Sequence, residues 1–318
     1  MLTIFTAAKP FRGGTATIQR NALRSWMQLH EDVQIILFGD AVGTQEVAWE
    51  LGLHYEASPK LTSSGAVRLD YMLATARRLA RYNVLCFVAC DILLQRDLCE
   101  ALNRVEALHH EFVMVGRAGT VRTEVADACS SADAMNRAAK NVHVASLESA
   151  SKSLHARLDY VIFSRNCFVG NVAELPAKSP FATKWLMRRA MANEVHVVDA
   201  SRMVGALKQI EPESGCVTIP EAPAARRNLL CAEEKLVLFG EYGHLLGMMH
   251  APYLLTSKDI VTNRWLRLGH WRTRTGLKSA LLSRVWQGLK TQLRKPHEFP
   301  TADRLLGPAI LRASERQP

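Results

Sequence analysis

The sequence predicts an α/β protein with a mainly parallel, twisted sheet and helices on both of its faces. Three segments are apolar throughout, as strands buried on both faces are: residues 2–7, 33–39 and 84–90. Helical spacing of apolar side chains occupies the stretches that separate them: residues 15–29, 44–51 and 66–82. This alternation implies right-handed crossovers, which bring the carboxyl ends of the strands to one edge of the sheet.

Each element has its own signal. The helix over 15–29 carries Ile18, Ala22 and Trp26 on one face. The strand over 33–39 stops at a Gly-Asp pair, and the strand over 84–90 runs directly into Asp91. Further strands are expected at 112–116, 158–163 and 194–198, with a helix over 181–193.

Composition divides the chain into two parts. With 318 residues, 48% of them hydrophobic and 22% charged, the chain is long and apolar enough for a sizeable globular core. Its net charge of +10 is concentrated in residues 257–295, which hold ten basic residues and one acid. We therefore predict an α/β domain over 1–250 and a basic C-terminal extension over 251–318.

The extension contains a predicted basic amphipathic helix. From Leu277, apolar residues recur every fourth position as far as Leu293, with basic residues mainly on the opposite side. Two interpretations remain open: residues 257–295 bind an anionic membrane surface, or the helix packs on its own domain with a solvated basic face. Nucleic acid is not favoured as a partner, because no recognised binding motif accompanies the charge.

Several protein classes are disfavoured. No run approaches the roughly 18 apolar residues of a membrane-spanning helix, and the N-terminus lacks the pattern of a signal peptide. Seven cysteines without a CxxC pair indicate reduced core thiols. These features favour a cytoplasmic protein, either free or peripheral at the inner face of the membrane. The absence of GxGxxG and GxxxxGK[ST] weighs against dehydrogenases and P-loop proteins.

Asp91 is the strongest candidate functional residue. It stands between the apolar segments 84–90 and 92–94, where a carboxylate is costly unless a metal, a cation or backbone donors compensate it. A structural role in a cap or loop is one interpretation. The other is a ligand for Mg²⁺ or Mn²⁺ holding a diphosphate.

Six ordered segments carry a resemblance to a known family: TIFTAAKPF (3–11), ATIQRNALRSW (16–26), ILFGD (36–40), LCFVACDILL (85–94), LDYVIFSRNCF (158–168) and VHVVDAS (195–201). The chain resembles a bacterial GT-A-type glycosyltransferase family of the nucleotide-diphospho-sugar transferase superfamily, over roughly residues 1–245. The resemblance implies a GT-A-like fold, a nucleotide-sugar donor and a divalent cation, Mn²⁺ or Mg²⁺, that is weakly bound or dispensable. The acceptor, whether glycan, lipid or small molecule, is not implied.

The resemblance also implies positions in the site. Residues expected to hold the nucleotide are Thr6, Ala7, Ala8, Lys9, Arg12, Asp40, Arg68 and Asp70. Asp91 matches the last acid of the metal-binding DxD-type motif, and Asp159 matches a position near the sugar or the acceptor. Surface or turn roles remain open for Arg12, Asp40, Arg68 and Asp70.

The sequence departs from the family pattern at three places. Ala89 replaces a polar residue two positions before Asp91, and Thr183 stands where the family has a carboxylate. Lys208 and Glu211 lie in the segment that replaces a His-rich stretch of the family. We expect Lys208 to act as a fixed positive charge on the diphosphate and Glu211 to be a substitute metal ligand or a base.

Two functions follow from these departures. The chain is an active glycosyltransferase that depends less on metal and uses Asp159, Glu174 or Glu211 as base, or it is a pseudo-glycosyltransferase that only binds or scaffolds.

Overall fold

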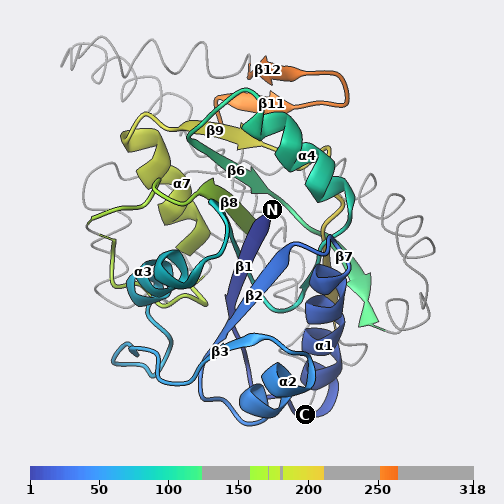
Figure 1. The fold of residues 1–318 in the computed structure, drawn as a ribbon, viewed down its shortest axis with the longest axis vertical. Helices are drawn as coiled ribbons and strands as arrows, with labels where there is room; N and C mark the ends of the chain where they lie inside the picture. The colour runs from blue at the N-terminus through green and yellow to red at the C-terminus, as the bar shows by residue number, and fades with distance from the viewer. Residues whose placement is uncertain (124–157, 171, 180–181, 211–250, 264–318) are drawn as a thin grey trace, which may run out of the picture. The chain divides into compact units, whose positions relative to one another are not determined.

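The computed structural model describes residues 1–123, 158–170, 172–179, 182–210 and 251–263. All of them belong to one compact unit, Met1–Leu266. Its centre is a sheet of nine strands in the order β12-β11-β9-β6-β8-β4-β1-β2-β3 (Figure 1). The strands are β1 (Leu2–Ala7), β2 (Val33–Phe38), β3 (His54–Glu56), β4 (Val84–Val88), β6 (Phe112–Gly116), β8 (Tyr160–Ser164), β9 (His196–Asp199), β11 (Tyr253–Leu255) and β12 (Ile260–Thr262).

The sheet is mixed but mainly parallel, as predicted. Strands β3, β2, β1 and β4 run parallel to one another, and β6, β9 and β11 form a second parallel group. Between them β8 is antiparallel to both β4 and β6, so Tyr160 lies opposite Val88 on one side and Gly116 on the other. The amino end of β8 therefore lies at the edge where β4 and β6 end.

Helices cover both faces of this sheet, because side chains alternate sides along each strand. On one face, α1 (Gly13–Met27), α2 (Thr44–Glu50) and α4 (Asp97–Glu106) pack on a cluster that includes Leu2 and Ile4. On the other, α3 (Leu69–Leu79) and α7 (Ala182–Ala192) pack on a cluster that includes Phe5. The predicted three-layer arrangement is confirmed for these elements.

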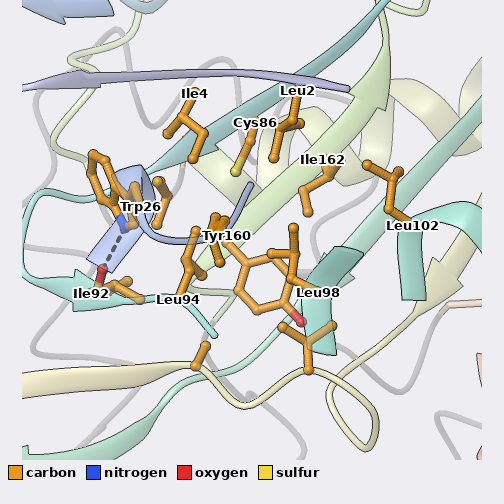
Figure 2. Close-up of a cluster of buried hydrophobic side chains, with 14 of the residues drawn as sticks. Leu2, Ile4, Trp26, Cys86, Ile92, Leu94, Leu98, Leu102, Tyr160 and Ile162 are labelled. Carbon is orange, nitrogen blue, oxygen red and sulfur yellow. Dashed lines mark hydrogen bonds between the residues drawn. The ribbon is translucent and has the colours of Figure 1, made fainter. Parts of the chain in front are cut away.

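The core on the α1 face joins the sheet to the chain after Asp91. Figure 2 shows Trp26 of α1 directed at the backbone of Ile92, and its Nε1 donates a 2.9 Å hydrogen bond to the Ile92 carbonyl oxygen. Trp26 and Tyr160 are fully buried in this cluster. The packing fixes the position of α1 relative to residues 91–94, and hence the frame around Asp91.

A smaller sheet contains β5 (Ile92–Leu93), β10 (Leu207–Ile210) and β7 (Gly119–Arg122) in the order β5-β10-β7. Strand β10 is antiparallel to β5, with Lys208 opposite Ile92, and parallel to β7. This small sheet brings residues 207–210 next to Asp91, more than a hundred residues away in the chain.

The first residues of the predicted extension belong to the large sheet. Strand β11 pairs with β9, and Leu255 is fully buried. The rest of the predicted extension, including the amphipathic helix from Leu277, lies outside the described residues, so the domain boundary and the membrane-binding segment stay predictions. None of the helices that the structure describes is long and apolar enough to cross a membrane.

Candidate functional site

Several of the predicted site residues lie at one edge of the large sheet, at or after the carboxyl ends of its strands. Strands β1, β2 and β4 are parallel, so residues 6–9, 40 and 91 follow their carboxyl ends. Thr6 and Ala8 are buried, with exposed fractions of 1% and 3%. Their side chains are therefore buried beneath this edge of the sheet. Ala7 is partly buried against the core cluster that includes Phe5.

The loop after β1 is held by Gln19 of α1. The Lys9 backbone N–H donates to Gln19 Oε1 at 2.7 Å, and Gln19 Nε2 donates to the Lys9 carbonyl oxygen at 2.9 Å. Gln19 is buried, whereas Lys9 and Arg12 are exposed. The amide thus fixes the loop backbone and leaves the two basic side chains toward solvent.

Lys178 is a site residue that sequence reasoning missed. Its Nζ donates a 2.8 Å hydrogen bond to the Ala8 carbonyl oxygen. Burial lowers the pKa of Lys178, and the nearby charge of Lys9 lowers it further. No local pattern could have revealed this lysine, because it reaches the loop after β1 from a segment 170 residues later.

That segment is tied to the start of α3. The Leu69 N–H donates to the Leu175 carbonyl oxygen and the Ala177 N–H to the Val67 carbonyl oxygen, both at 2.8 Å. These hydrogen bonds fix the backbone just before Lys178 relative to the start of α3. The position of the lysine therefore depends on this pairing.

Asp91 lies beside Lys208. Lys208 Nζ is 3.6 Å from Asp91 Oδ2, and the two side chains are 30% and 20% exposed. The Gln209 N–H donates to the Asp91 carbonyl oxygen at 2.9 Å. The other carboxylate oxygen, Oδ1, is buried and makes no hydrogen bond. Asp91 is therefore partly covered and paired with a close cation.

The described residues around Asp91 do not form a complete metal site. A divalent cation such as Mg²⁺ takes about six oxygen ligands, several from water and substrate phosphates. Here Asp91 Oδ2 faces the ammonium group of Lys208, and the alanine at position 89 offers no side-chain ligand. Burial raises the pKa of the Cys90 thiol, so the thiol stays protonated and is a poor metal ligand. Within the described ranges, no three His, Cys, Asp or Glu side chains gather as metal ligands. The metal role of Asp91 stays a prediction.

Arg68 and Asp70 form a compact ion pair at the start of α3. Arg68 donates from Nε to Oδ1 at 3.0 Å and from Nη2 to Oδ2 at 2.7 Å. Its Nη2 also contacts Glu174 Oε1 at 2.6 Å. The hydrogen bond that Arg68 donates to Asp70 and the charges of both acids raise the pKa of Arg68. This geometry is that of a structural clamp between α3 and residues 174–177, and it engages Glu174, one of the candidate bases.

Asp40 and Asp159 occupy different settings at the same edge. Asp40 is exposed after β2, where its charge helps raise the pKa of Tyr55, an effect led by burial of that phenol. Asp159 is buried at the start of β8, and its Oδ2 accepts a 2.9 Å hydrogen bond from the Ala118 N–H. Glu211 lies outside the described residues.

Thr183 has a structural contact in place of the family's carboxylate. Its hydroxyl donates a 2.9 Å hydrogen bond to the Leu158 carbonyl oxygen. It thereby fixes the backbone one residue before Asp159.

A separate pocket of about 380 Å³ lies at the opposite edge, near the amino ends of β6 and β9. Residues 108–111 and 193–196 line it. None of the predicted site residues belongs to it.

No family model matches the chain, and no curated protein matches it. Solved structures of GT-A glycosyltransferases, the class that the sequence resembles, do match. S. aureus TarS residues 1–349 is 12% identical, with 67% of this chain and 58% of that chain covered and a TM-score of 0.37.

Two further matches have similar values. Mannosyltransferase PcManGT from Pyrobaculum calidifontis, solved with GDP-Man and Mn²⁺, is 11% identical over 67% of this chain and 58% of that chain, with a TM-score of 0.42. M. tuberculosis glucosyl-3-phosphoglycerate synthase is 10% identical over 63% and 70%, with a TM-score of 0.38. This chain covers only part of the TarS chains that it matches, between 35% and 58% of their length.

Proposed function

We propose that this chain is a glycosyltransferase that moves a sugar from a nucleotide-diphosphate donor to an acceptor. The observation that carries the proposal is the meeting of Asp91 and Lys208, 3.6 Å apart, just beyond the carboxyl end of β4. Ligands of open α/β sheets bind outside the carboxyl ends of the strands. The sequence resemblance over residues 1–245 gives this edge its expected ligand, a nucleotide sugar.

The charges at this edge suit the departure of a nucleotide diphosphate. When the bond between the sugar and the diphosphate breaks, negative charge grows on the leaving phosphate oxygens. Fixed cations lower the energy of that state, because they are already oriented when the charge develops. Lys208 and Lys178 are held in place here, Lys208 by Asp91 and Lys178 by the Ala8 carbonyl oxygen.

Among the residues that the structure describes, the candidate bases are already in contact with other groups. An inverting transfer needs a base near the acceptor hydroxyl. Asp159 accepts from the Ala118 N–H, and Glu174 contacts Arg68. These engagements favour the second candidate function, a pseudo-glycosyltransferase that binds a nucleotide sugar and serves as a binding or scaffolding subunit.

Calorimetry with UDP- and GDP-sugars, with and without Mn²⁺, tests the first step. We expect one donor class to bind and to release its nucleotide diphosphate slowly. Asp91→Ala should reduce that release roughly 100-fold, because Lys208 loses its partner. Glu31→Ala, an exposed acid before β2, is the matched control and should leave it unchanged.

The outcomes separate the two functions. Diphosphate release that depends on Asp91 supports an enzyme. Tight binding with no release across a panel of glycan, lipid and small-molecule acceptors supports the pseudo-glycosyltransferase. Absence of binding to any nucleotide sugar overturns both.

A further inference from the structure

We propose that lysine ammonium groups, those of Lys208, Lys178 and Lys9, supply the positive charge for the diphosphate, so that this site binds a diphosphate without a divalent cation. The inference rests on the proposed function for the identity of the donor. It goes beyond that function in stating what takes the place of the metal.

The Asp91 carboxylate is directed toward a lysine. In a site built around a divalent ion, carboxylate oxygens face the ion and its shell of oxygens. Here Oδ2 faces Lys208 Nζ at 3.6 Å, while Oδ1 is buried within the protein. A metal at Oδ2 would stand against the ammonium group, and the two cations would repel each other.

The backbone that carries Lys208 is held by hydrogen bonds to neighbouring elements. Gln209 beside it is buried, its N–H donates to the Asp91 carbonyl oxygen, and its Nε2 donates to the Ile18 carbonyl oxygen at 2.8 Å. Asn21 Nδ2 donates to Gln209 Oε1 at 3.1 Å. The backbone of β10 is therefore tied to α1 and to Asp91, so the ammonium group starts from a fixed base.

Lys178 and Lys9 form a second group of cations, at the loop after β1. Lys9 lies near enough to Lys178 for its charge to add to the effect of burial, which lowers the pKa of Lys178. Neither lysine forms an ion pair with an acid among the residues that the structure places. Lys178 uses one of its three N–H donors on the Ala8 carbonyl oxygen, which leaves two for a ligand. Two adjacent ammonium groups without an acid favour an anion between them.

Cys90 connects the two groups of charges. Its buried thiol, next to Asp91 in the chain, donates to the Gln19 carbonyl oxygen at 3.9 Å, and the Gln19 side chain in turn binds the Lys9 backbone. The three lysines and the aspartate together carry two net positive charges at neutral pH. A diphosphate carries a comparable negative charge, and an ammonium group is a competent point charge for phosphate.

The test uses inorganic pyrophosphate as probe and calorimetry of the full chain, once with a chelator and once with Mg²⁺. We expect the chelator to change the wild-type Kd less than about 2-fold. Lys178→Gln and Lys208→Gln should each weaken binding roughly 10-fold, as loss of one charge-assisted contact does. Lys258→Gln, an exposed lysine between β11 and β12, is the matched control and should bind as wild type.

Folding is controlled by Lys178→Arg and by the thermal midpoint of each variant. The arginine keeps the charge, so we expect it to bind within a few fold of wild type. Pyrophosphate binding that disappears in chelator and returns with Mg²⁺ overturns the proposal. So does equal binding by the wild type and both glutamine variants, or no binding in either buffer.

The result can be told apart from failure of the proposed function. Nucleotide-sugar binding that strictly needs a divalent cation leaves the transferase standing and removes the lysine site. Pyrophosphate binding through the lysines, with no response to any nucleotide sugar, keeps the site and removes the transferase.

Discussion

Arg68 and Asp70 show how the same residues were assigned differently by sequence and by structure. The resemblance implies that both residues line the nucleotide pocket, and a surface role is the alternative for each. In the fold they pair with each other through two hydrogen bonds, and Arg68 also reaches Glu174. This is the arrangement of a bidentate guanidinium–carboxylate pair, which has a fixed geometry. A nucleotide role for either side chain stays a prediction.

The pair makes stability depend on pH. Burial by itself raises the pKa of Asp70, but the hydrogen bonds from Arg68 and the backbone outweigh it, so the pKa lies below its ordinary value of 3.8. A lowered carboxyl pKa contributes stability above the unfolded value, and this contribution is lost as the pH falls through the folded value. We expect Asp70→Asn to lower the free energy of unfolding at pH 7 and to flatten its fall below about pH 4.

Urea unfolding followed from pH 7 to pH 2 measures this effect, with Glu31→Gln, an exposed acid, as the control. If wild type and Asp70→Asn lose stability in parallel as the pH falls, the ion pair does not contribute as described.

Strand β8 positions Asp159, one of the predicted site residues. Its antiparallel direction brings Asp159 to the edge that holds Asp91, and it places Tyr160 against both neighbouring strands. The Tyr160 ring covers Gly116 so closely that a Cβ at position 116 would lie 1.9 Å from Tyr160 Cζ. Glycine is required here by the space that the ring takes.

Gly116→Ala is therefore expected to destabilise the protein by about 1–3 kcal/mol, the usual cost of overpacking a core. Chemical denaturation measures it, and Thr120→Ala on β7, an exposed position, should change the free energy of unfolding by less than about 0.5 kcal/mol. An alanine variant as stable as wild type would mean that the tyrosine ring moves away at no cost.

At the scale of the whole molecule, the α/β domain extends beyond the predicted boundary at residue 250. A change in composition suggested residue 250. Strands β11 and β12, Tyr253–Leu255 and Ile260–Thr262, extend the large sheet beyond β9, and Leu255 is buried in the same cluster as Leu2 and Trp26. Residues 251–263 thus share a core with the first strand of the chain.

Leu255→Ala tests this shared core. Truncating a buried leucine costs about 2–5 kcal/mol, and we expect a single unfolding transition with a lower midpoint. Val261→Ala on the adjacent strand, where the valine is 41% exposed, is the control. A Leu255→Ala protein with wild-type stability would show that β11 contributes little to the body.

Many strands and helices of the α/β domain could be predicted from local sequence patterns. Residues 2–7, 33–39 and 84–90 were predicted as strands, and the structure has Leu2–Ala7, Val33–Phe38 and Val84–Val88. Continuous apolar runs predict buried strands well because burial on both faces requires an apolar side chain at every position. The helix over 15–29 appears as Gly13–Met27 for the same kind of reason, since one apolar face is enough to define it.

The sequence by itself predicted the layered α/β fold. It also indicated Asp91 as the strongest candidate functional residue and Lys208 as a fixed positive charge. Only the tertiary structure decided that β8 runs antiparallel, that Lys208 lies against Asp91, that Lys178 reaches the loop after β1, and that residues 251–263 complete the sheet. The sequence of a fully buried apolar strand does not reveal its direction in the sheet, because the same side chains are buried in either direction. Contacts between residues 91 and 208, or 8 and 178, depend on how distant elements pack, which no local pattern encodes.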